Sequence, residues 1–297
     1  MKLNSLGFHH FSGLFSLSIK LRSRIYDHTV ASNTTVKISI SEMMMTKLEI
    51  LSPYPALKLK TKNKKYLIVS DLHIGFEHRF NKDGFNITPS ITKMLQTLTE
   101  LVQLHKPDKL LILGDVKSGF GRINKEEWKY VPKLIEKIVK QVEISIIPGN
   151  HDGRLISLLP KEVKLESREL LIDDTGFFHG HTIPTKKLSS ATRLVMGHIH
   201  PTYSRKGSPL SGRPIWLTLR VQKKFIFKEH EGTDDIIEVW VMPTFNTELS
   251  SDGLRVFRKK IISPLFRKIN GTVSEALIIT LDGSVIGDVN SMKYVLQ

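Results

Sequence analysis

Residues 66–73 read YLIVSDLH. The first five form a short apolar, β-branched run that predicts a buried strand. Asp71 and His73 follow directly, two positions apart, so both side chains can face one metal ion from the loop after that strand. Two later apolar runs, at residues 109–113 and 142–147, are also followed by side chains that can bind a metal ion. These lie in Gly114-Asp115 and in Gly149-Asn150-His151.

Between these strands the apolar residues follow a helical spacing. Thr88 and Pro89 predict the start of a first helix, because Thr caps and Pro is tolerated at the first helical position. Asn124 predicts the cap of a second helix, on which Trp128 is expected to face inward with its apolar neighbours. The order strand, helix, strand, helix, strand predicts an α/β fold with parallel pairing.

Beyond about residue 165 the helical pattern fades, and short strands are predicted instead. This second half should form a mostly β layer packed on the first. Its expected strands are residues 170–172, 177–178, 194–196, 215–219, 225–227, 236–242 and 276–281.

Two of these strands lead into histidine motifs, His179-Gly180-His181 and Gly197-His198-Ile199-His200. Imidazole favours Mn, Fe, Zn or Ni, so a mixed Asp, Asn and His set predicts two divalent ions, Mn²⁺ first, with Fe, Zn, Ni or Mg as alternatives. Two ions about 3.5–4 Å apart can clamp a phosphate and activate water. The predicted ligands are Asp71, His73, Asp115, Asn150, His179, His198 and His200.

Asp115 and His151 are expected to have special roles. Asp115 follows a neighbouring strand, and its two oxygens can bridge two ions. His151 stands beside Asn150 and is expected to stay off the metals, where it can donate a proton to the leaving oxygen or hydrogen-bond the phosphoryl oxygens. Asp152 is expected either to orient His151 or to cap a following helix.

Composition narrows the function classes. The chain has 297 residues and no cysteine, which excludes disulfides, thiolate zinc sites and cysteine nucleophiles. No run approaches the roughly 18 apolar residues of a transmembrane helix, so we expect no membrane partner and a cytoplasmic protein. The formal charge of +15 favours polyanionic partners such as nucleic acid, or reflects only a lysine-rich, solvated surface.

Two segments depart from the globular pattern. Residues 1–42 hold eight serines and only two acidic residues, without a sustained period. We expect residues 1–45 to be a disordered tail or a mis-assigned start upstream of the methionines at 43–45, and their composition weakly resembles a transit peptide. Residues 46–297 should form the catalytic domain, with a basic insertion at about 204–234.

The motifs occur in the order D-x-H, G-D, G-N-H-[DE], a His beside a Gly, and G-H-x-H, within residues 64–200. This set resembles the calcineurin-like metallophosphoesterase superfamily. The resemblance implies a four-layer α/β-β/α sandwich that holds two metals at its strand ends. It also implies a first metal on Asp71, His73 and His200. The second would lie on Asn150, His179 and His198, with Asp115 bridging and His151 as the catalytic histidine.

His181 matches no universal ligand position of that pattern. It can lie behind the ligands, face the substrate, or be an ordinary loop histidine. The resemblance leaves these three readings open.

Within the superfamily the chain looks most like archaeal and bacterial single-domain phosphoesterases related to the SbcD nuclease. The similar phrases are YPAL at 54–57, GDVK at 114–117 and VMPTFN at 241–246. This similarity implies a DNA-repair setting. Ser118 departs from the pattern, because SbcD-type nucleases carry His there and protein phosphatases carry Asp. A hydroxyl is a poor proton donor, so Ser118 weighs against a protein phosphatase and against efficient strand cleavage.

The sequence therefore predicts a metal-dependent phosphoric ester hydrolase, acting as a phosphodiesterase on nucleic acid or on a small phosphodiester. A second interpretation is a phosphomonoesterase or nucleotide hydrolase. A third is a non-catalytic scaffold on the same fold. Missing metal ligands would indicate the scaffold, and here none is missing.

Overall fold

A six-stranded sheet, in the order β1-β2-β3-β4-β5-β6, carries the first three motifs. The computed structural model describes residues 46–78, 90–230, 234–250 and 263–295, all within one unit of residues 38–297. The strands are β1 (Lys47–Ile50), β2 (Leu57–Lys60), β3 (Lys65–Val69), β4 (Lys109–Ile112), β5 (Glu143–Ile146) and β6 (Lys164–Leu165). From β3 to β6 the pairing is parallel, so the carboxyl ends of β3, β4 and β5 share one edge.

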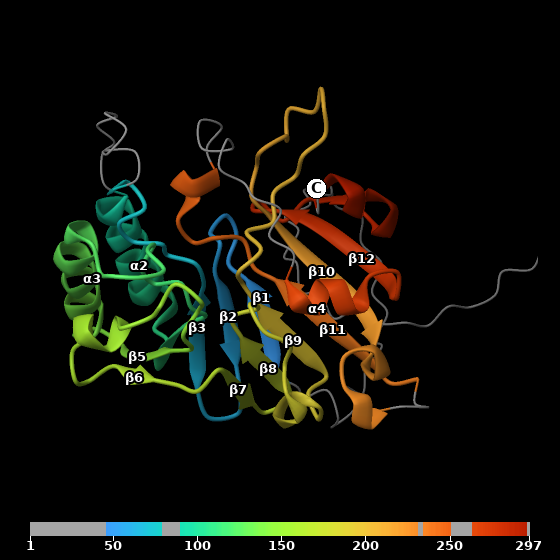
Figure 1. The fold of residues 1–297 in the computed structure, drawn as a ribbon, viewed down its shortest axis with the longest axis horizontal. Coiled ribbons are helices and arrows are strands. Elements are labelled where there is room, and N and C mark those ends of the chain that lie inside the picture. The colour runs from blue at the N-terminus through green and yellow to red at the C-terminus, as the bar shows by residue number, and fades with distance from the viewer. Residues whose placement is uncertain (1–45, 79–89, 231–233, 251–262, 296–297) are drawn as a thin grey trace, which may run out of the picture. The chain divides into compact units, whose positions relative to one another are not determined.

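Helices α2 (Ile91–His105) and α3 (Lys125–Ile138) connect these strands and pack on one face of the sheet (Figure 1). The predicted cap of α3 is confirmed, because the Asn124 side chain accepts from the Glu127 backbone N–H and Glu127 closes a capping box. The inward orientation predicted for Trp128 is wrong, since this residue is 54% exposed. Thr88 and Pro89 lie outside the described residues.

The second sheet has seven strands in the order β13-β12-β10-β11-β9-β8-β7. Their bounds are β7 (Glu169–Ile172), β8 (Thr175–Phe178), β9 (Arg193–Met196), β10 (Ile215–Gln222), β11 (Ile236–Val241), β12 (Val273–Thr280) and β13 (Val285–Gly287). Strands β8, β9 and β11 are mutually parallel and the other pairs are antiparallel. The carboxyl ends of β8 and β9, which precede the two histidine motifs, therefore also lie at one edge.

Short helices complete the second half. Helix α4 (Pro264–Ile269) packs with Leu265, Phe266 and Ile269 against the second sheet. The 3-10 helices are η2 (Leu155–Leu158), η3 (Lys186–Leu188), η4 (Lys223–Phe225), η5 (Lys228–His230), η6 (Thr247–Ser250) and η8 (Val289–Tyr294).

Two expectations for this half were wrong. The strand predicted at 225–227 is absent, because η4 and a turn occupy that stretch. The basic insertion expected at about 204–234 is interrupted, because β10 pairs with both β11 and β12 in the middle of the second sheet. Only the segments on either side of β10 lie outside the sheet.

Both faces of each sheet are buried. In the first sheet Leu67, Val69 and Leu110 pack with α2 and α3, while Ile68 and Leu111, which alternate with them, are also fully buried. The second sheet repeats this alternation, with fully buried side chains such as Phe177 and Trp216 on the face away from α4. Two mixed sheets with helices on their outer faces form the predicted α/β sandwich (Figure 1).

Candidate metal centre

Loops that follow strands of the first sheet contact loops that follow strands of the second sheet. The backbone N–H of His198 donates to both carboxylate oxygens of Asp71, at 3.2 and 3.0 Å. His179 Nδ1 donates to the Leu113 carbonyl at 2.7 Å. These contacts join the loops after β8 and β9 to the loops after β3 and β4.

The segment after β11 ties the same edge together from another direction. Thr244 Oγ1 donates to the Asp71 carbonyl at 2.7 Å, and Asn246 Nδ2 donates to the Leu72 carbonyl at 3.0 Å. The backbone N–H of Phe245 donates to the Ser70 carbonyl at 2.8 Å. The VMPTFN phrase of the sequence thus holds the loop that carries Asp71 and His73.

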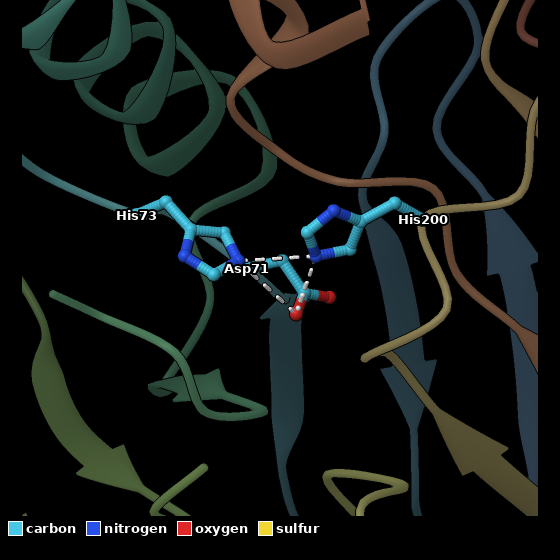
Figure 2. A group of neighbouring side chains, drawn as sticks. All are labelled: Asp71, His73 and His200. Atoms are coloured by element: carbon cyan, nitrogen blue, oxygen red, sulfur yellow. Dashed lines mark hydrogen bonds and ion pairs between the residues drawn. The ribbon is translucent and has the colours of Figure 1, made fainter. Parts of the chain in front are cut away.

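A first ligand cluster consists of Asp71, His73 and His200 (Figure 2). His200 Nε2 lies 3.1 Å from Asp71 Oδ1 and 3.1 Å from His73 Nε2. His73 Nε2 lies 4.0 Å from the same Asp71 oxygen. The two ring nitrogens and the carboxylate oxygen point toward one another, so a single cation can be held by all three.

Asp115 lies between this cluster and a second one. The second cluster is Asp115, His179 and His198, and Asp115 also groups with His73 and His151. Asp115 Oδ2 is 3.3 Å from His179 Nε2 and 3.6 Å from His73 Nε2. One carboxylate oxygen is therefore close to ring nitrogens from both clusters, as a bridging ligand requires.

Two buried polar atoms show that a cation fits this site. Asn150 Oδ1 and His179 Nε2 are buried without a hydrogen-bond partner among the described residues. Such atoms cost free energy unless something satisfies them. His179 donates its other ring N–H to a backbone carbonyl, which is the orientation common for metal-binding histidines. The donor set of carboxylate, amide and imidazole suits divalent transition ions.

The pKa values of the clustered histidines are consistent with metal binding. Burial, with the charge of His200, lowers the pKa of His73 to about 3, and burial with the charge of His179 lowers the pKa of His198 to about 4. Both rings are therefore neutral near pH 7 and offer a lone pair. Burial alone would lower the pKa of His179, but the Asp115 and Asp71 carboxylates outweigh it and raise that pKa to about 9. A metal ion would take the place of that proton.

The carboxylates also stay ionised. Burial alone would raise the pKa of Asp71, but His200 and His179 offset it and lower that pKa to about 2. The pKa of Asp115 is likewise held below its usual range, because its contacts with His179, His73 and His151 outweigh burial. Two anionic carboxylates buried among imidazoles form a site that favours positive charge.

The backbone of several predicted ligand residues is held in an uncommon conformation. Eight described non-glycine residues have positive φ, and five of them are predicted ligands: Asp71, His73, Asp115, His198 and His200, with φ of 58°, 43°, 52°, 71° and 49°. Such conformations cost free energy and cluster where surrounding structure fixes a functional side chain. The strand-end loops are therefore shaped around the ligands.

His151 lies beside the clusters with one ring nitrogen already used. Its Nδ1 donates to the Ser118 carbonyl, because a carbonyl can only accept. Its Nε2 faces the cluster, 3.8 Å from Asp115 Oδ2. Ser118 is 4% exposed and contributes its backbone carbonyl here, a contact that sequence reasoning did not predict.

Phe120 is a further residue that sequence reasoning missed. Its ring lies against the His151 ring with centroids 3.6 Å apart, although Phe120 is 63% exposed. The loop that carries it is anchored by Glu127, whose side chain is fully buried and accepts from the Gly119 N–H at 2.6 Å and the Asn124 N–H at 2.9 Å. An exposed aromatic residue before a helix gives no sequence signal for this contact.

Asp152 has a different role from both that were expected. Its Oδ1 accepts from the backbone N–H of Val116 and Lys117, and its Oδ2 accepts from that of Gly149. The side chain thus clamps the loop after β4 to the loop after β5, and the helix-cap expectation is wrong because η2 begins three residues later behind Arg154. Burial and the charge of Asp115 raise the pKa of Asp152 to about 6.

His181 lies near the second cluster without joining any of the three ligand groups found among the described residues. Its ring centroid is 5.3 Å from that of His179 and 6.2 Å from that of His198. Its Nδ1 is buried and has no hydrogen-bond partner within the described part of the chain. Burial and the charge of His179 lower the pKa of His181, so the ring is neutral.

A glycine next to the ligands permits the closest approach of two loops. A Cβ on Gly149 would lie 2.1 Å from Asp115 Oδ1 and 2.5 Å from the Asp115 backbone nitrogen. We therefore expect Gly149→Ala to lower the free energy of unfolding by about 1–3 kcal/mol, the usual cost of overpacking, and to weaken Mn²⁺ binding. Denaturant unfolding without metal and Mn²⁺ titration measure the two effects.

Gly121→Ala is the matched control, because a Cβ there would meet no atom within 4 Å. It should leave both quantities unchanged. Equal behaviour of the two variants would show that the contact between Gly149 and Asp115 does not shape the site.

Comparison with known families agrees with this geometry. The profile of one family, described as calcineurin-like phosphoesterase, matches residues 64–252. The chain belongs to this family. A calcineurin-like phosphoesterase is a metal-dependent phosphoric ester hydrolase, and the clusters of Asp and His described above lie inside the matched residues.

A search of curated proteins found no match. Three solved structures are similar to this calcineurin-like chain. The nuclease MPE of Pseudomonas putida has 15% identity and a TM-score of 0.47, over 81% of this chain and 100% of the other. The phosphoesterase Yfce of E. coli has 17% identity and a TM-score of 0.34, over 75% and 97%.

The third similar structure is a protein of unknown function, AQ665 from Aquifex aeolicus. It has 18% identity and a TM-score of 0.33, over 49% of this chain and 83% of the other. All three scores are too low to support a functional conclusion. Among the helices that the structure describes, none has the length and apolar character needed to cross a bilayer.

Proposed function

We propose that this calcineurin-like enzyme is a phosphodiesterase that works with two divalent metal ions. The observation that carries the proposal is the position of Asp115, whose Oδ2 is 3.3 Å from His179 Nε2 and 3.6 Å from His73 Nε2. A single carboxylate between two groups of ligands is the arrangement expected for a bridged pair of ions.

In this proposal the predicted ligands are divided between the two ions. Asp71, His73 and His200 hold the first ion, while Asn150, His179 and His198 hold the second. Asp115 contacts both. When bound, such a pair polarises phosphoryl oxygens and lowers the pKa of water. Manganese is the proposed metal because the ligand set mixes carboxylate and amide oxygens with imidazole nitrogens.

His151 is proposed as the group that handles the proton of the leaving oxygen. Its Nδ1–H is fixed on the Ser118 carbonyl, which leaves Nε2 as the nitrogen that faces the cluster. A protonated ring can then donate from Nε2 to the leaving oxygen. Phe120, packed on the ring, limits the orientations that His151 can adopt.

The proposed substrate is nucleic acid or a small phosphodiester, in a DNA-repair setting. The formal charge of +15 and the SbcD-like phrases at 54–57, 114–117 and 241–246 support this assignment. SbcD-type nucleases carry His at the position of Ser118. Because a hydroxyl is a poor proton donor, we expect this enzyme to cleave nucleic-acid strands only weakly. Residues 46–297 are proposed as the catalytic domain, and the assay below, repeated on that segment alone, tests it.

The test is hydrolysis of bis-p-nitrophenyl phosphate and p-nitrophenyl phosphate by purified protein. We expect Mn²⁺ to support hydrolysis of the diester more strongly than that of the monoester, because the reaction needs the metal-activated water and His151 as acid. Excess EDTA should abolish turnover, and added Mn²⁺ should restore it. Metal analysis should find up to two ions per chain.

Three results would contradict the proposal. Full turnover in excess EDTA would exclude metal-assisted hydrolysis. Preference for the monoester would make the enzyme a phosphomonoesterase, the second interpretation of the sequence. Bound metal without turnover of either ester would favour the scaffold.

A further inference from the structure

A basic hairpin begins directly after the metal-site residue His200. Residues 201–214, which we call the basic hairpin, read PTYSRKGSPLSGRP and contain three cationic residues and no acid. They are Arg205, Lys206 and Arg213, and all three are exposed. Within the described residues none of the three has an ion pair, whereas Arg220 and Lys224, a little further along the chain, are both paired with acids.

The base of the hairpin is fixed to the core. Thr202 forms a β-bridge with Pro214, the Tyr203 N–H donates to the Arg213 carbonyl at 3.0 Å, and the Gly212 N–H donates back to Tyr203 at 2.6 Å. Tyr203 is only 5% exposed, and the Ser204 N–H donates to the Tyr294 carbonyl at 2.7 Å. The three cations therefore project from an anchored hairpin.

Topology places this hairpin at the edge of the metal centre. It follows the carboxyl end of β9, where His198 and His200 lie, and leads into the amino end of β10. Because β10 runs antiparallel to β11 and β11 runs parallel to β9, that end of β10 lies at the same edge. In Figure 1 the hairpin is the gold loop that leads into the amino end of β10. Arg205, five residues after His200, can lie at most about 17 Å from it.

An aromatic residue from the C-terminal segment adds to the cationic surface. The Arg205 guanidinium lies 5.3 Å from the centroid of the Tyr294 ring, and Lys293 Nζ lies 5.3 Å from the same ring. Lys293 is exposed and has no ion pair in the part of the chain that the structure describes. Arg205 and Lys293 thus share one aromatic ring, and Lys206 and Arg213 add two more cations from the same hairpin.

We propose that the basic hairpin binds the phosphate backbone of a nucleic-acid strand whose scissile diester lies in the metal centre. This inference rests on the proposed phosphodiesterase function and extends it to a substrate class. A substrate with phosphates on both sides of the cleaved bond places further negative charge next to the site. Cations held there without acidic partners can contact that charge and release its counterions.

The test compares two triple variants with equal loss of charge. R205A/K206A/R213A removes the hairpin cations, and K133A/K137A/K140A removes three exposed lysines from α3 and the turn after it. Binding of a labelled single-stranded oligonucleotide is measured by fluorescence anisotropy over a range of salt, with EDTA present to prevent cleavage. The slope of log K against log salt counts the phosphate contacts.

We expect the hairpin variant to bind the oligonucleotide at least about tenfold more weakly at low salt. The slope of log K against log salt should be shallower by about 2, which is about 0.7 for each of the three lost contacts. The control variant should bind as the unaltered protein does. If the triple hairpin variant fails to fold, the single change Lys206→Ala should still reduce the slope by about 0.7.

Equal slopes for both triple variants would overturn the proposal. So would a hairpin variant that keeps its affinity for the oligonucleotide but loses binding to phosphatidylserine vesicles, which would assign the hairpin to a lipid surface. Turnover of bis-p-nitrophenyl phosphate by the unaltered protein is measured separately. Its absence would remove the phosphodiesterase function, while the slopes would still decide whether the hairpin binds nucleic acid.

Discussion

His151→Ala should lower turnover of a phosphodiester by about 10²–10⁴-fold, the usual effect of losing a general acid. The metal content should stay near that of the unaltered protein. The reason is geometric: the His151 Nδ1–H donates to the Ser118 carbonyl, and Nε2 lies 3.8 Å from Asp115 Oδ2. The closest contacts between the predicted ligands are shorter, at 3.1 and 3.3 Å. Turnover with saturating Mn²⁺ and metal analysis of the same preparation check both parts.

The alternative is that His151 itself is a ligand, since it groups with His73 and Asp115. A variant purified without metal would establish that alternative and remove the proton-donor role. Substrates with different leaving groups sharpen the test, because loss of an acid slows esters with poor leaving groups the most. His105→Ala, at the end of α2, is the matched control and should change neither quantity.

Asp115→Ala should strongly weaken both metal binding and hydrolysis. Asp115 is the residue that is close to ring nitrogens of both clusters, and its carboxylate is 2% exposed. Metal assistance supplies several kcal/mol to such reactions, so its loss should lower turnover by about 10³-fold or more. Mn²⁺ titration by calorimetry should detect at most one weakly bound ion.

Asp115→Asn separates the charge from the fold. The backbone N–H of His151 donates to Asp115 Oδ1 at 2.9 Å, and an amide oxygen can still accept this hydrogen bond. The amide is neutral, however, and bridges metal ions poorly. We expect a folded protein with weak metal binding. Asp234→Asn, at an exposed carboxylate far along the chain, is the control. Two tightly bound ions in Asp115→Asn would show that Asp115 is not the bridge.

Much of the first half of the fold could be predicted from local sequence. The runs before Asp71 and Asp115 are short, apolar and β-branched, and β3 and β4 lie where those runs lie. The N-cap of α3 could be predicted because it depends on Asn124 and the residues that directly follow it. Trp128 could not be placed, because its exposure depends on which face of α3 meets the sheet.

The short elements of the second half were harder to predict. Phe225 and Phe227 are apolar enough for a strand, yet η4 forms there, because the backbone N–H groups of Ile226 and Phe227 donate to the Lys223 carbonyl. The strands β1 and β2 were not predicted, since each is only four residues long, KLEI and LKLK, and so short an alternation is a weak signal. Their place comes from tertiary pairing, because β2 pairs with β3 and β1 pairs with β2.

By itself, the sequence determined the family and the set of candidate ligand residues, because each motif is short and stands at a strand end. Only the tertiary structure decided how the candidates group. His198 meets Asp71 across 127 residues of chain, and Asp152 braces the loop of Val116 across 36. It also decided that Phe120 packs on His151 and that five predicted ligand residues adopt positive φ. These features depend on contacts between loops of the first sheet and between the two sheets, and no local spacing of residues encodes that packing.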